Sequence, residues 1–419
     1  MKSNFRIQSI KAREILDSRG NPTLEVEVTT EGRVFRASVP SGASKGKYEA
    51  VELRDGGRRY QGKGVRKAIR NINKVIAPKL KGKDPTKQKE IDNLMIRLDG
   101  TKNKSKLGGN AICGVSMAVC RAGAFLKNFP LYRYLAEMAG ENPPFSLPQS
   151  AFNVINGGVH AGNELDFQEF MIVPQASHFS TSLQIACEIY YELKTLIQER
   201  YIDLAINVGD EGGFAPPVRV PEEALELLLT TMDNLGYQKN TKIMIDVAAS
   251  QFYEQGKYKT RIGIFTKEGL FNYYSRLVGK YPIIGLEDPF AQDDWKGWQE
   301  ITRQLKSKKL LIIGDDLLAT NPQRIKLAKE RNACNALIIK INQIGTITEA
   351  LKAVQLAKFF GWKIIVSHRS GDTCDDFIAD FAVGVKADFI KSGAPSRGER
   401  VAKYNRLLKI EEELKGRGN

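Results

Sequence analysis

Six short apolar runs in the second half of the chain each carry a charged residue where the run ends. They are IMIDVAAS (243–250), IIGLEDPF (283–290), LLIIGDDLLAT (310–320), ALIIKINQIGT (336–346), KIIVSHRSGD (363–372) and the weaker ADFIKSGAPSRGER (387–400). Continuous Ile, Leu and Val are typical of parallel strands buried on both faces. Helical patterns fill the gaps between the runs. The alternation predicts a (β/α) barrel whose site lies at the C-terminal ends of its strands.

The first third of the chain follows a different pattern. Residues 5–39 predict a β-meander, because the turns DSRGNP and EG separate three short runs and TLEVEVTT alternates strictly. Helical patterns dominate residues 61–140, and the stretch 139–150 is rich in Pro, Gly and Ser, as linkers are. We therefore predict an N-terminal α+β domain over residues 1–138, with a mobile loop at 41–47, and a barrel domain over 139–419.

Composition narrows the class of protein. The chain has 419 residues, 42% of them apolar, so a large core is possible and wholesale disorder is excluded. The N-terminus lacks a signal-peptide pattern and no uninterrupted apolar stretch reaches about 18–20 residues, which predicts a cytoplasmic protein without a membrane span. The net charge of +15 suits a phosphate-bearing substrate. No RNP or zinc-finger pattern is present, so nucleic acid is not required as a ligand.

Three carboxylates come from successive strand ends: Asp246, Glu287 and Asp315. Brought together they would repel one another, and a hard divalent cation resolves this repulsion. All-oxygen ligands favour Mg²⁺ over zinc. Alternatively, each carboxylate could cap a helix or face solvent. That interpretation is weaker here, because three successive units place an acidic residue at the same position. Asp316, next to Asp315, should point to the other side of its strand.

Lys340 lies inside ALIIKIN, a run too apolar to tolerate an unpaired charge. It could be a Schiff-base nucleophile, a general base kept neutral by its surroundings, or a structural partner of one carboxylate. Lys391 repeats this placement one unit later. Two lysines near a metal favour proton abstraction with charge stabilisation over a lone Schiff base.

Further polar motifs lie outside these strands. SHRSGD (367–372) offers a guanidinium, a hydroxyl and backbone amides, which suit a phosphate clamp. The same residues could also be a polar turn that opens the next helix. GDEGGFAPP (209–217) and NGGVHAGNELDFQEFMIVP (156–174) carry acidic residues and a histidine among glycines, and each is weak evidence alone. SGASKGKYEAVELRDG (41–56) suits a lid that closes on substrate.

Taken together, these strings resemble the enolase family. DSRGNPT, SGAS, HAGN, QEFMI, GDEGGFAP, LEDP, GDD, KINQIGT, SHRSGD and the KYN and IEEEL tail follow the family's order over essentially the whole chain. The resemblance implies an N-terminal α+β domain and an enolase-type TIM-like barrel, ββαα(βα)6. It also implies Mg²⁺-dependent, reversible dehydration of 2-phospho-D-glycerate to phosphoenolpyruvate, a step of glycolysis and gluconeogenesis.

The resemblance also assigns roles. Lys340 matches the base at C2, and Glu211 matches the general acid for loss of the C3 hydroxyl. Asp246, Glu287 and Asp315 match the ligands of one Mg²⁺, and Ser44 matches a ligand of a second Mg²⁺ that binds with substrate. Residues matched to substrate contacts are His160, Glu169, Glu287, Asp315, His368, Arg369, Ser370 and Lys391.

The chain departs from the family's pattern in a few places. Lys45 stands where Thr is usual, and Gln251 stands where Glu is usual, which could change loop closure or kinetics. The family is usually a homodimer or an octamer. By analogy Arg13 would face Glu399, and Glu25 would face Lys409, across a twofold axis. Lys409 replaces the usual Arg and cannot form a bidentate fork, so that contact should be weaker.

Rival functions remain open at this point. An acid-sugar dehydratase, racemase or cycloisomerase would share the carboxylates and bases but would not need the phosphate clamp. A Schiff-base lyase would use Lys340 without metal. A binding protein on the same scaffold, with a cell-surface, secreted or RNA-complex role, would tolerate loss of a catalytic residue, and none is missing here.

Overall fold

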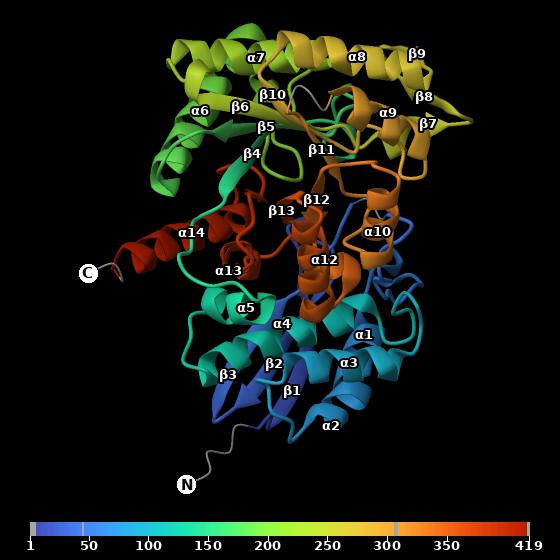
Figure 1. Ribbon diagram of the computed structural model, residues 1–419, viewed down its shortest axis with the longest axis vertical. Coiled ribbons are helices and arrows are strands. Elements are labelled where there is room, and N and C mark those ends of the chain that lie inside the picture. The colour runs from blue at the N-terminus through green and yellow to red at the C-terminus, as the bar shows by residue number, and fades with distance from the viewer. Residues whose placement is uncertain (1–5, 44–45, 306–308, 417–419) are drawn as a thin grey trace.

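The computed structural model describes residues 6–43, 46–305 and 309–416. A small lobe built from the N-terminal third lies at one end of a larger barrel (Figure 1). The lobe holds an antiparallel meander of β1 (Ser9–Leu16), β2 (Pro22–Thr30) and β3 (Arg33–Ser38). Alternation along β2 buries Leu24, Val26 and Val28 completely, while Glu25 and Glu27 face the other side. This is the pattern that the sequence predicts for a half-buried sheet.

Four helical elements of the lobe pack on this sheet: α1 (Arg66–Asn71), η2 (Ile72–Ile76), α2 (Ala77–Leu80) and α4 (Gly109–Leu126). Behind them, α3 (Gln88–Asp99) and α5 (Leu131–Ala139) pack on α4. Among the described helices, α4 is the one long and apolar enough to cross a membrane, but 83% of it is buried inside the protein. Gly114 allows its close approach to the sheet, since a Cβ there would lie 2.7 Å from the Val26 side chain. α4 is therefore a core helix of the lobe.

Eight strands close into the barrel. They are β4 (Gln149–Asn156), β5 (Glu169–Pro174), β6 (Thr241–Asp246), β10 (Ile283–Glu287), β11 (Leu311–Gly314), β12 (Ala336–Ile339), β13 (Lys363–Ser367) and β14 (Phe389–Lys391). β5 runs antiparallel to both of its neighbours, and the other pairs are parallel. Two helices, α6 (Phe179–Arg200) and α7 (Pro221–Asn234), follow β5 before β6 begins. The predicted ββαα(βα)6 class is confirmed.

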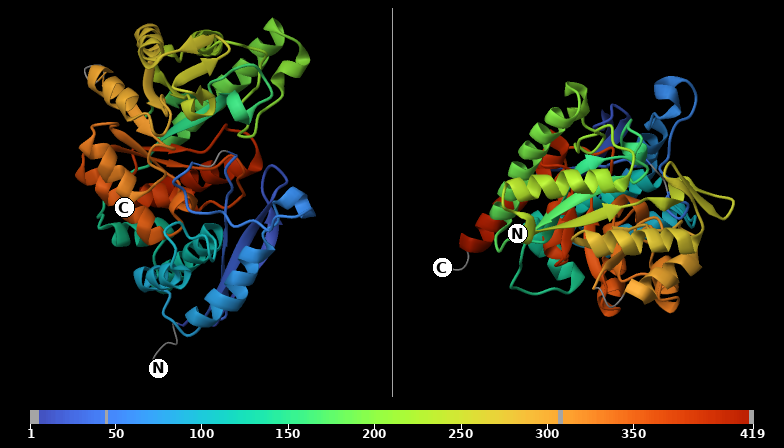
Figure 2. Two further views of the ribbon diagram at one scale, coloured as in Figure 1. Left: turned by 90° about the vertical axis from the view of Figure 1, so that its right-hand side faces the viewer. Right: turned by 90° about the horizontal axis from the view of Figure 1, so that it is seen from above.

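Further helices and a small sheet surround the barrel (Figure 2). The helices are α8 (Lys267–Lys280), α9 (Trp295–Leu305), α10 (Pro322–Glu330), α11 (Ile341–Ile344), α12 (Ile347–Phe359), α13 (Phe377–Gly384) and α14 (Gly398–Gly416). The sheet consists of β7 (Tyr253–Glu254), β8 (Lys257–Thr260) and β9 (Gly263–Phe265). α14 packs against α6 and α13 and buries Tyr404, Leu407 and Ile410, as its amphipathic pattern predicts.

A buried carboxylate joins the lobe to the barrel. Asp92 of α3 accepts hydrogen bonds from the Ser116 hydroxyl of α4 (2.7 Å) and from the Thr348 backbone N–H at the start of α12 (3.0 Å). Burial raises the pKa of Asp92, and these hydrogen bonds oppose that rise. These hydrogen bonds connect α3 and α4 of the lobe to α12 of the barrel domain.

Candidate active site

Four acidic side chains from neighbouring strands lie at the barrel rim, and three of them, Glu169, Asp246 and Asp315, form the floor of a pocket. Asp246 and Glu287 are the last residues of β6 and β10, Asp315 follows β11 directly, and Glu169 opens β5 opposite Asp246. Because strand ends of a barrel meet at one rim, spacing along the chain becomes proximity in space. Lys391, at the end of β14, lies among them, with its Nζ 2.9 Å from Glu169, 3.1 Å from Asp246 and 2.9 Å from Glu287.

Carboxyl groups outnumber the cation among these side chains. All five are buried, and Lys391 supplies one positive charge to the three carboxyl groups that it contacts. Burial, followed by repulsion from Asp246, raises the pKa of Glu287 well above its usual value. Its Oε1 is buried without a hydrogen-bond partner among the described residues. A crowded set of oxygen donors with an unpaired acceptor fits Mg²⁺.

Two further carboxylates stand beside this floor. The Asp288 carboxylate accepts the backbone N–H groups of Asp315 (3.0 Å) and Asp316 (2.7 Å), and Asp288 itself has a φ of 41°. Asp288 therefore shapes the turn after β11. No role was predicted for Asp288 from the sequence, although its position directly after Glu287 was a usable signal.

The prediction that Asp316 points away from the site is wrong. β11 ends at Gly314, so the alternation of a strand does not extend to Asp316, and this side chain lines the same pocket as Asp315. Burial, followed by repulsion from Asp315, raises the pKa of Asp316 to about 7.

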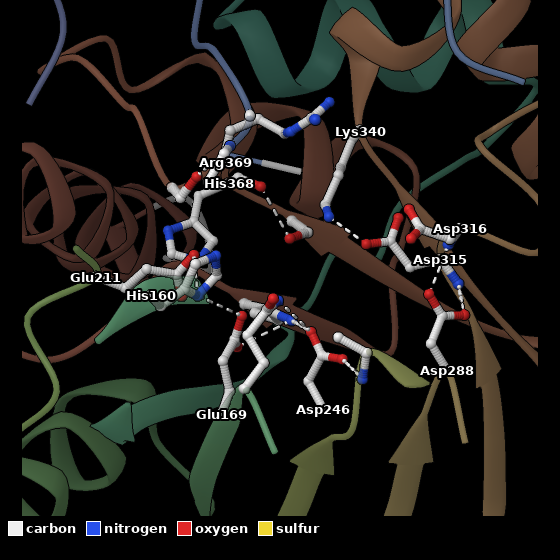
Figure 3. A pocket seen from close by; sticks show the side chains of 17 residues that line it. His160, Glu169, Glu211, Asp246, Asp288, Asp315, Asp316, Lys340, His368 and Arg369 are labelled. Carbon is white, nitrogen blue, oxygen red and sulfur yellow. Dashed lines mark hydrogen bonds and ion pairs between the residues drawn. The ribbon is translucent and has the colours of Figure 1, made fainter. Parts of the chain in front are cut away.

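Lys340 points into the pocket toward Asp315, across from Glu211 and His160 (Figure 3). It is the first residue after β12, at the start of α11, rather than inside a strand as predicted. Its Nζ forms an ion pair with the Asp315 carboxylate, whose other oxygen accepts a hydrogen bond from Gln343 Nε2 (2.8 Å). Burial acts to lower the pKa of Lys340, but the attraction of Asp315 outweighs it and the pKa is raised.

The opposite wall consists of Glu211, His160, His368 and Glu169. Glu211 Oε2 lies 3.1 Å from His368 Nε2, and His160 Nδ1 lies 3.6 Å from both Glu169 and Glu211. Asn153 Nδ2 donates to Glu211 at 3.0 Å. Figure 3 shows this group and Lys340 on opposite sides of the pocket.

Protonation differs sharply among these groups. Burial lowers the pKa of His368 to about 4, so this ring is neutral near pH 7. Burial, followed by repulsion from Glu211, raises the pKa of Glu169 well above its usual value. For Glu211 burial also acts to raise the pKa, but the adjacent His368 and His160 side chains outweigh it and lower the pKa. Two carboxyls thus stand side by side, with a proton favoured on Glu169.

The predicted phosphate clamp lies where the lobe meets the barrel. The buried Arg369 guanidinium contacts Glu49 at 2.9 Å and Asn342 Oδ1 at 3.2 Å. Ser370 Oγ accepts the Ala43 backbone N–H at 2.7 Å, so the lobe's loop touches the clamp directly. Ser44 and Lys45 lie outside the described residues. Gln251 is exposed and does not line the pocket.

A closed barrel with acidic and basic side chains gathered at the C-terminal ends of its strands defines a TIM-barrel enzyme. Comparison with known proteins identifies which one. Residues 7–135 match the family described as "Enolase, N-terminal domain", and residues 144–419 match "Enolase, C-terminal TIM barrel domain". The chain therefore belongs to the enolase family.

Similar proteins extend this match over nearly the full length. The chain is 53% identical to an enolase of Mastigamoeba balamuthi, over 97% of this chain and 96% of the relative. It is 56% identical to enolase B of Dictyostelium discoideum, over 97% and 95%. It is 52% identical to an enolase of Thermococcus gammatolerans, over 99% and 97%. Membership at this level makes the protein a lyase of the phosphopyruvate hydratase class.

Proposed function

We propose that the protein catalyses Mg²⁺-dependent, reversible dehydration of 2-phospho-D-glycerate to phosphoenolpyruvate, with Lys340 as the base at C2 and Glu211 as the general acid at C3. One observation carries the assignment of roles. Lys340 and Glu211 enter a single pocket from opposite sides, above a carboxylate floor (Figure 3). A substrate held between them would present its C2 proton to one side chain and its C3 hydroxyl to the other.

The metal would be held by Asp246, Glu287 and Asp315. When bound there, Mg²⁺ stabilises the negative charge that develops on the substrate carboxylate as the C2 proton leaves. Lys391 adds a fixed positive charge to the same region, since it lies within 3.1 Å of Asp246, Glu287 and Glu169. We expect two Mg²⁺ per site, the second binding with substrate and involving Ser44.

Lys340 must be neutral to accept a proton. In the metal-free protein its ion pair with Asp315 keeps it protonated. A cation held by Asp315 would offset this attraction, and burial would then lower the pKa of Lys340. In its neutral form the amine can remove the C2 proton of the bound substrate.

Glu211 must deliver a proton to the leaving hydroxide. Its carboxyl is oriented by Asn153 and His368, and Glu169, whose pKa is raised, stands on the other side of His160. We propose that this pair of carboxyls shares one proton, which Glu211 donates as the C3–O bond breaks and water leaves.

Arg369 and Ser370 would bind the phosphoryl group, with His160 and His368 completing the substrate contacts. In this structure Arg369 forms an ion pair with Glu49. A dianionic phosphoryl group would replace the Glu49 carboxylate as the partner of this guanidinium. This favours a phosphorylated substrate over the non-phosphorylated acids of related barrel enzymes.

We further propose a cytoplasmic homodimer or an octamer built from dimers. Lys409 is exposed on α14, and Arg13 is half exposed on β1, where it pairs with Glu27 at 2.7 Å within the chain. Both remain accessible for contacts with a second copy. The relatives named above are enolases, so a pure binding role on this scaffold has no support from them.

The test is a substrate panel read by ultraviolet absorbance of the enol-phosphate. 2-Phosphoglycerate should give a rise that EDTA abolishes and Mg²⁺ restores, whereas sugar acids without phosphate should give none. Borohydride trapping of a substrate adduct on Lys340, together with activity insensitive to EDTA, would instead support a Schiff-base lyase.

A further inference from the structure

The positive charge of this protein is concentrated in one stretch of the lobe. Residues 58–106 contain sixteen of the 63 basic residues and four of the 48 acidic ones, so they carry +12 of the net +15. Fourteen of these basic residues are exposed, against one exposed acidic residue, Glu90. Asp92 and Asp99 are buried and do not offset the surface charge. We call these fourteen side chains the basic lobe face.

Part of this face forms a regular stripe. α1, η2 and α2 form one continuous helical segment over residues 66–80, roughly 22 Å long at 1.5 Å per residue. Arg66, Arg70 and Lys74 recur every four residues on its exposed side. No described carboxylate forms an ion pair with any of these three. The segment belongs to the lobe, at the end of the molecule away from the barrel strands (Figure 1).

We propose that the basic lobe face binds the sugar–phosphate backbone of nucleic acid, without sequence preference. Its unpaired cations match a linear polyanion, and such binding rests on counterion release. A membrane is the less favoured partner, because interfacial binding also needs apolar side chains that insert. Within residues 58–106 the exposed large apolar side chains are Tyr60 and Val75.

The test measures binding of fluorescein-labelled U20 RNA, a 20-base-pair DNA duplex and phosphatidylserine vesicles to the full-length protein. The lobe variant is R66E/R70E/K74E. The control is K239E/K296E/K326E, which reverses three exposed lysines of the barrel part and changes the net charge equally. We expect the lobe variant to raise Kd for nucleic acid about tenfold or more, and to lower the salt slope by about 2 for single strands.

The comparison of RNA with duplex DNA identifies the preferred source of the backbone. Equal weakening by both variants would overturn the proposal, since net charge alone would then explain binding. Binding to vesicles but not to either nucleic acid would also overturn it. Both variants should retain lyase activity, because none of the altered residues lines the active-site pocket.

A second inference follows from a different observation, the environment of Arg400, and it rests on the proposed function. The Arg400 side chain is fully buried, and its Nη1 lies 2.6 Å from His368 Nδ1. Its guanidinium also donates to the backbone carbonyls of Arg369 (2.6 Å), Ser370 (2.5 Å) and Asp210 (3.0 Å). It therefore fastens the SHRSGD turn to the GDEGG turn that carries Glu211.

We infer that Arg400 is a positioning residue that sets the tautomer of His368. An arginine only donates hydrogen bonds, so His368 Nδ1 must accept. The ring proton then lies on Nε2, whose distance to Glu211 Oε2 is 3.1 Å. Arg400 thereby sets which ring nitrogen presents an N–H to the carboxyl of Glu211.

Nitrogen-15 NMR of histidine-labelled protein tests this inference. The chain has three histidines, and the spectrum of His368→Asn assigns the resonance of His368. The wild-type ring should be the neutral Nε2–H tautomer; an Nδ1–H tautomer would overturn the inference, whatever the outcome of the activity assay.

Variants separate positioning from general stability. Arg400→Lys should give a mixed tautomer and slow dehydration more than C2 proton exchange. The control is Arg406→Lys, on the same helix, where the arginine pairs with Asp380 outside the site. Retention of the wild-type tautomer in Arg400→Lys, or equal loss of both steps in the two variants, would contradict the positioning role.

Discussion

At the level of single residues, the proposed reaction is divided between two side chains, Lys340 and Glu211, on opposite sides of the pocket. Lys340→Ala should abolish exchange of the C2 proton with solvent, because no other amine of the described residues forms an ion pair with Asp315. Removing a general base typically costs 10²- to 10⁴-fold in rate. Loss of exchange is measured by NMR of 2-phosphoglycerate in D₂O. Mg²⁺ affinity, measured by calorimetry, should persist, and retained exchange would remove Lys340 as the base.

Glu211→Gln should have the complementary effect. The amide keeps the shape of the side chain but cannot donate the proton that the C3 hydroxide needs. Exchange at C2 should therefore continue while formation of phosphoenolpyruvate falls by about 10²-fold or more. Measuring both steps on one preparation separates the roles. Equal loss of exchange and dehydration would contradict the assignment.

The sequence made several of these residues visible before the structure. Lys340 and Lys391 stand out because a lysine in an apolar run needs a partner, and both have carboxylate partners. The sequence around Glu211 and Glu169 was only weak evidence for a functional site, since Gly-rich acidic turns and acidic residues at strand starts are common. Their closeness depends on barrel closure and on the antiparallel β5, and their roles were available only through the family resemblance.

At the scale of elements, strand ends explain both the correct and the incorrect predictions. Continuous apolar runs located the six barrel strands that carry the charged residues. The exact ends were less visible, because β11 stops at Gly314 and β12 at Ile339. This error of one or two residues reversed the expected direction of Asp316. Asp288 was overlooked because its role, accepting two N–H groups from the next strand end, depends on contacts between strands.

The turn after β11 predicts how stability depends on pH. Asp316 has a pKa of about 7 in the folded protein, against 3.8 for an ordinary aspartate. Between these values the folded state holds a proton that the unfolded state has lost, so the free energy of unfolding falls as pH rises. The Tm of the metal-free protein should therefore fall between about pH 4 and pH 7, the interval between these two pKa values.

Asp316→Asn supplies the control for this prediction. The amide does not titrate, so the variant should show a flatter dependence of Tm on pH, measured by calorimetry in EDTA. Mg²⁺ should also flatten the wild-type profile, because a cation stabilises ionised carboxylates. A wild-type Tm that rises steadily over this range would contradict the sign.

At the scale of the whole molecule, the lobe completes the pocket and bears the expected dimer contacts. Ser370 accepts a hydrogen bond from Ala43, and Arg369 pairs with Glu49, so residues more than 300 positions apart meet at the clamp. The resemblance predicted a loop that closes on substrate. Its key residue, Ser44, lies outside the described residues, so the second metal ligand remains a prediction, as does the domain boundary at residue 138.

Lys409→Glu should raise the dissociation constant of the proposed dimer. Lys409 is exposed on α14, and a glutamate there would repel the partner's Glu25 across the twofold axis. Sedimentation velocity over a range of protein concentrations measures the shift. The exposed Lys415, which already pairs with Glu411 within α14 at 3.5 Å, provides a matched control as Lys415→Glu. An unchanged oligomer in Lys409→Glu would refute this contact.

We expect this barrel to dehydrate a phosphorylated hydroxy acid with the help of Mg²⁺. Ultraviolet absorbance after mixing the protein with 2-phosphoglycerate, once with Mg²⁺ and once with EDTA, measures this reaction. Absorbance should rise with Mg²⁺, and EDTA should prevent the rise. No rise with folded, metal-loaded protein would contradict this expectation and would direct attention to Lys45 and Gln251, the departures from the family's pattern.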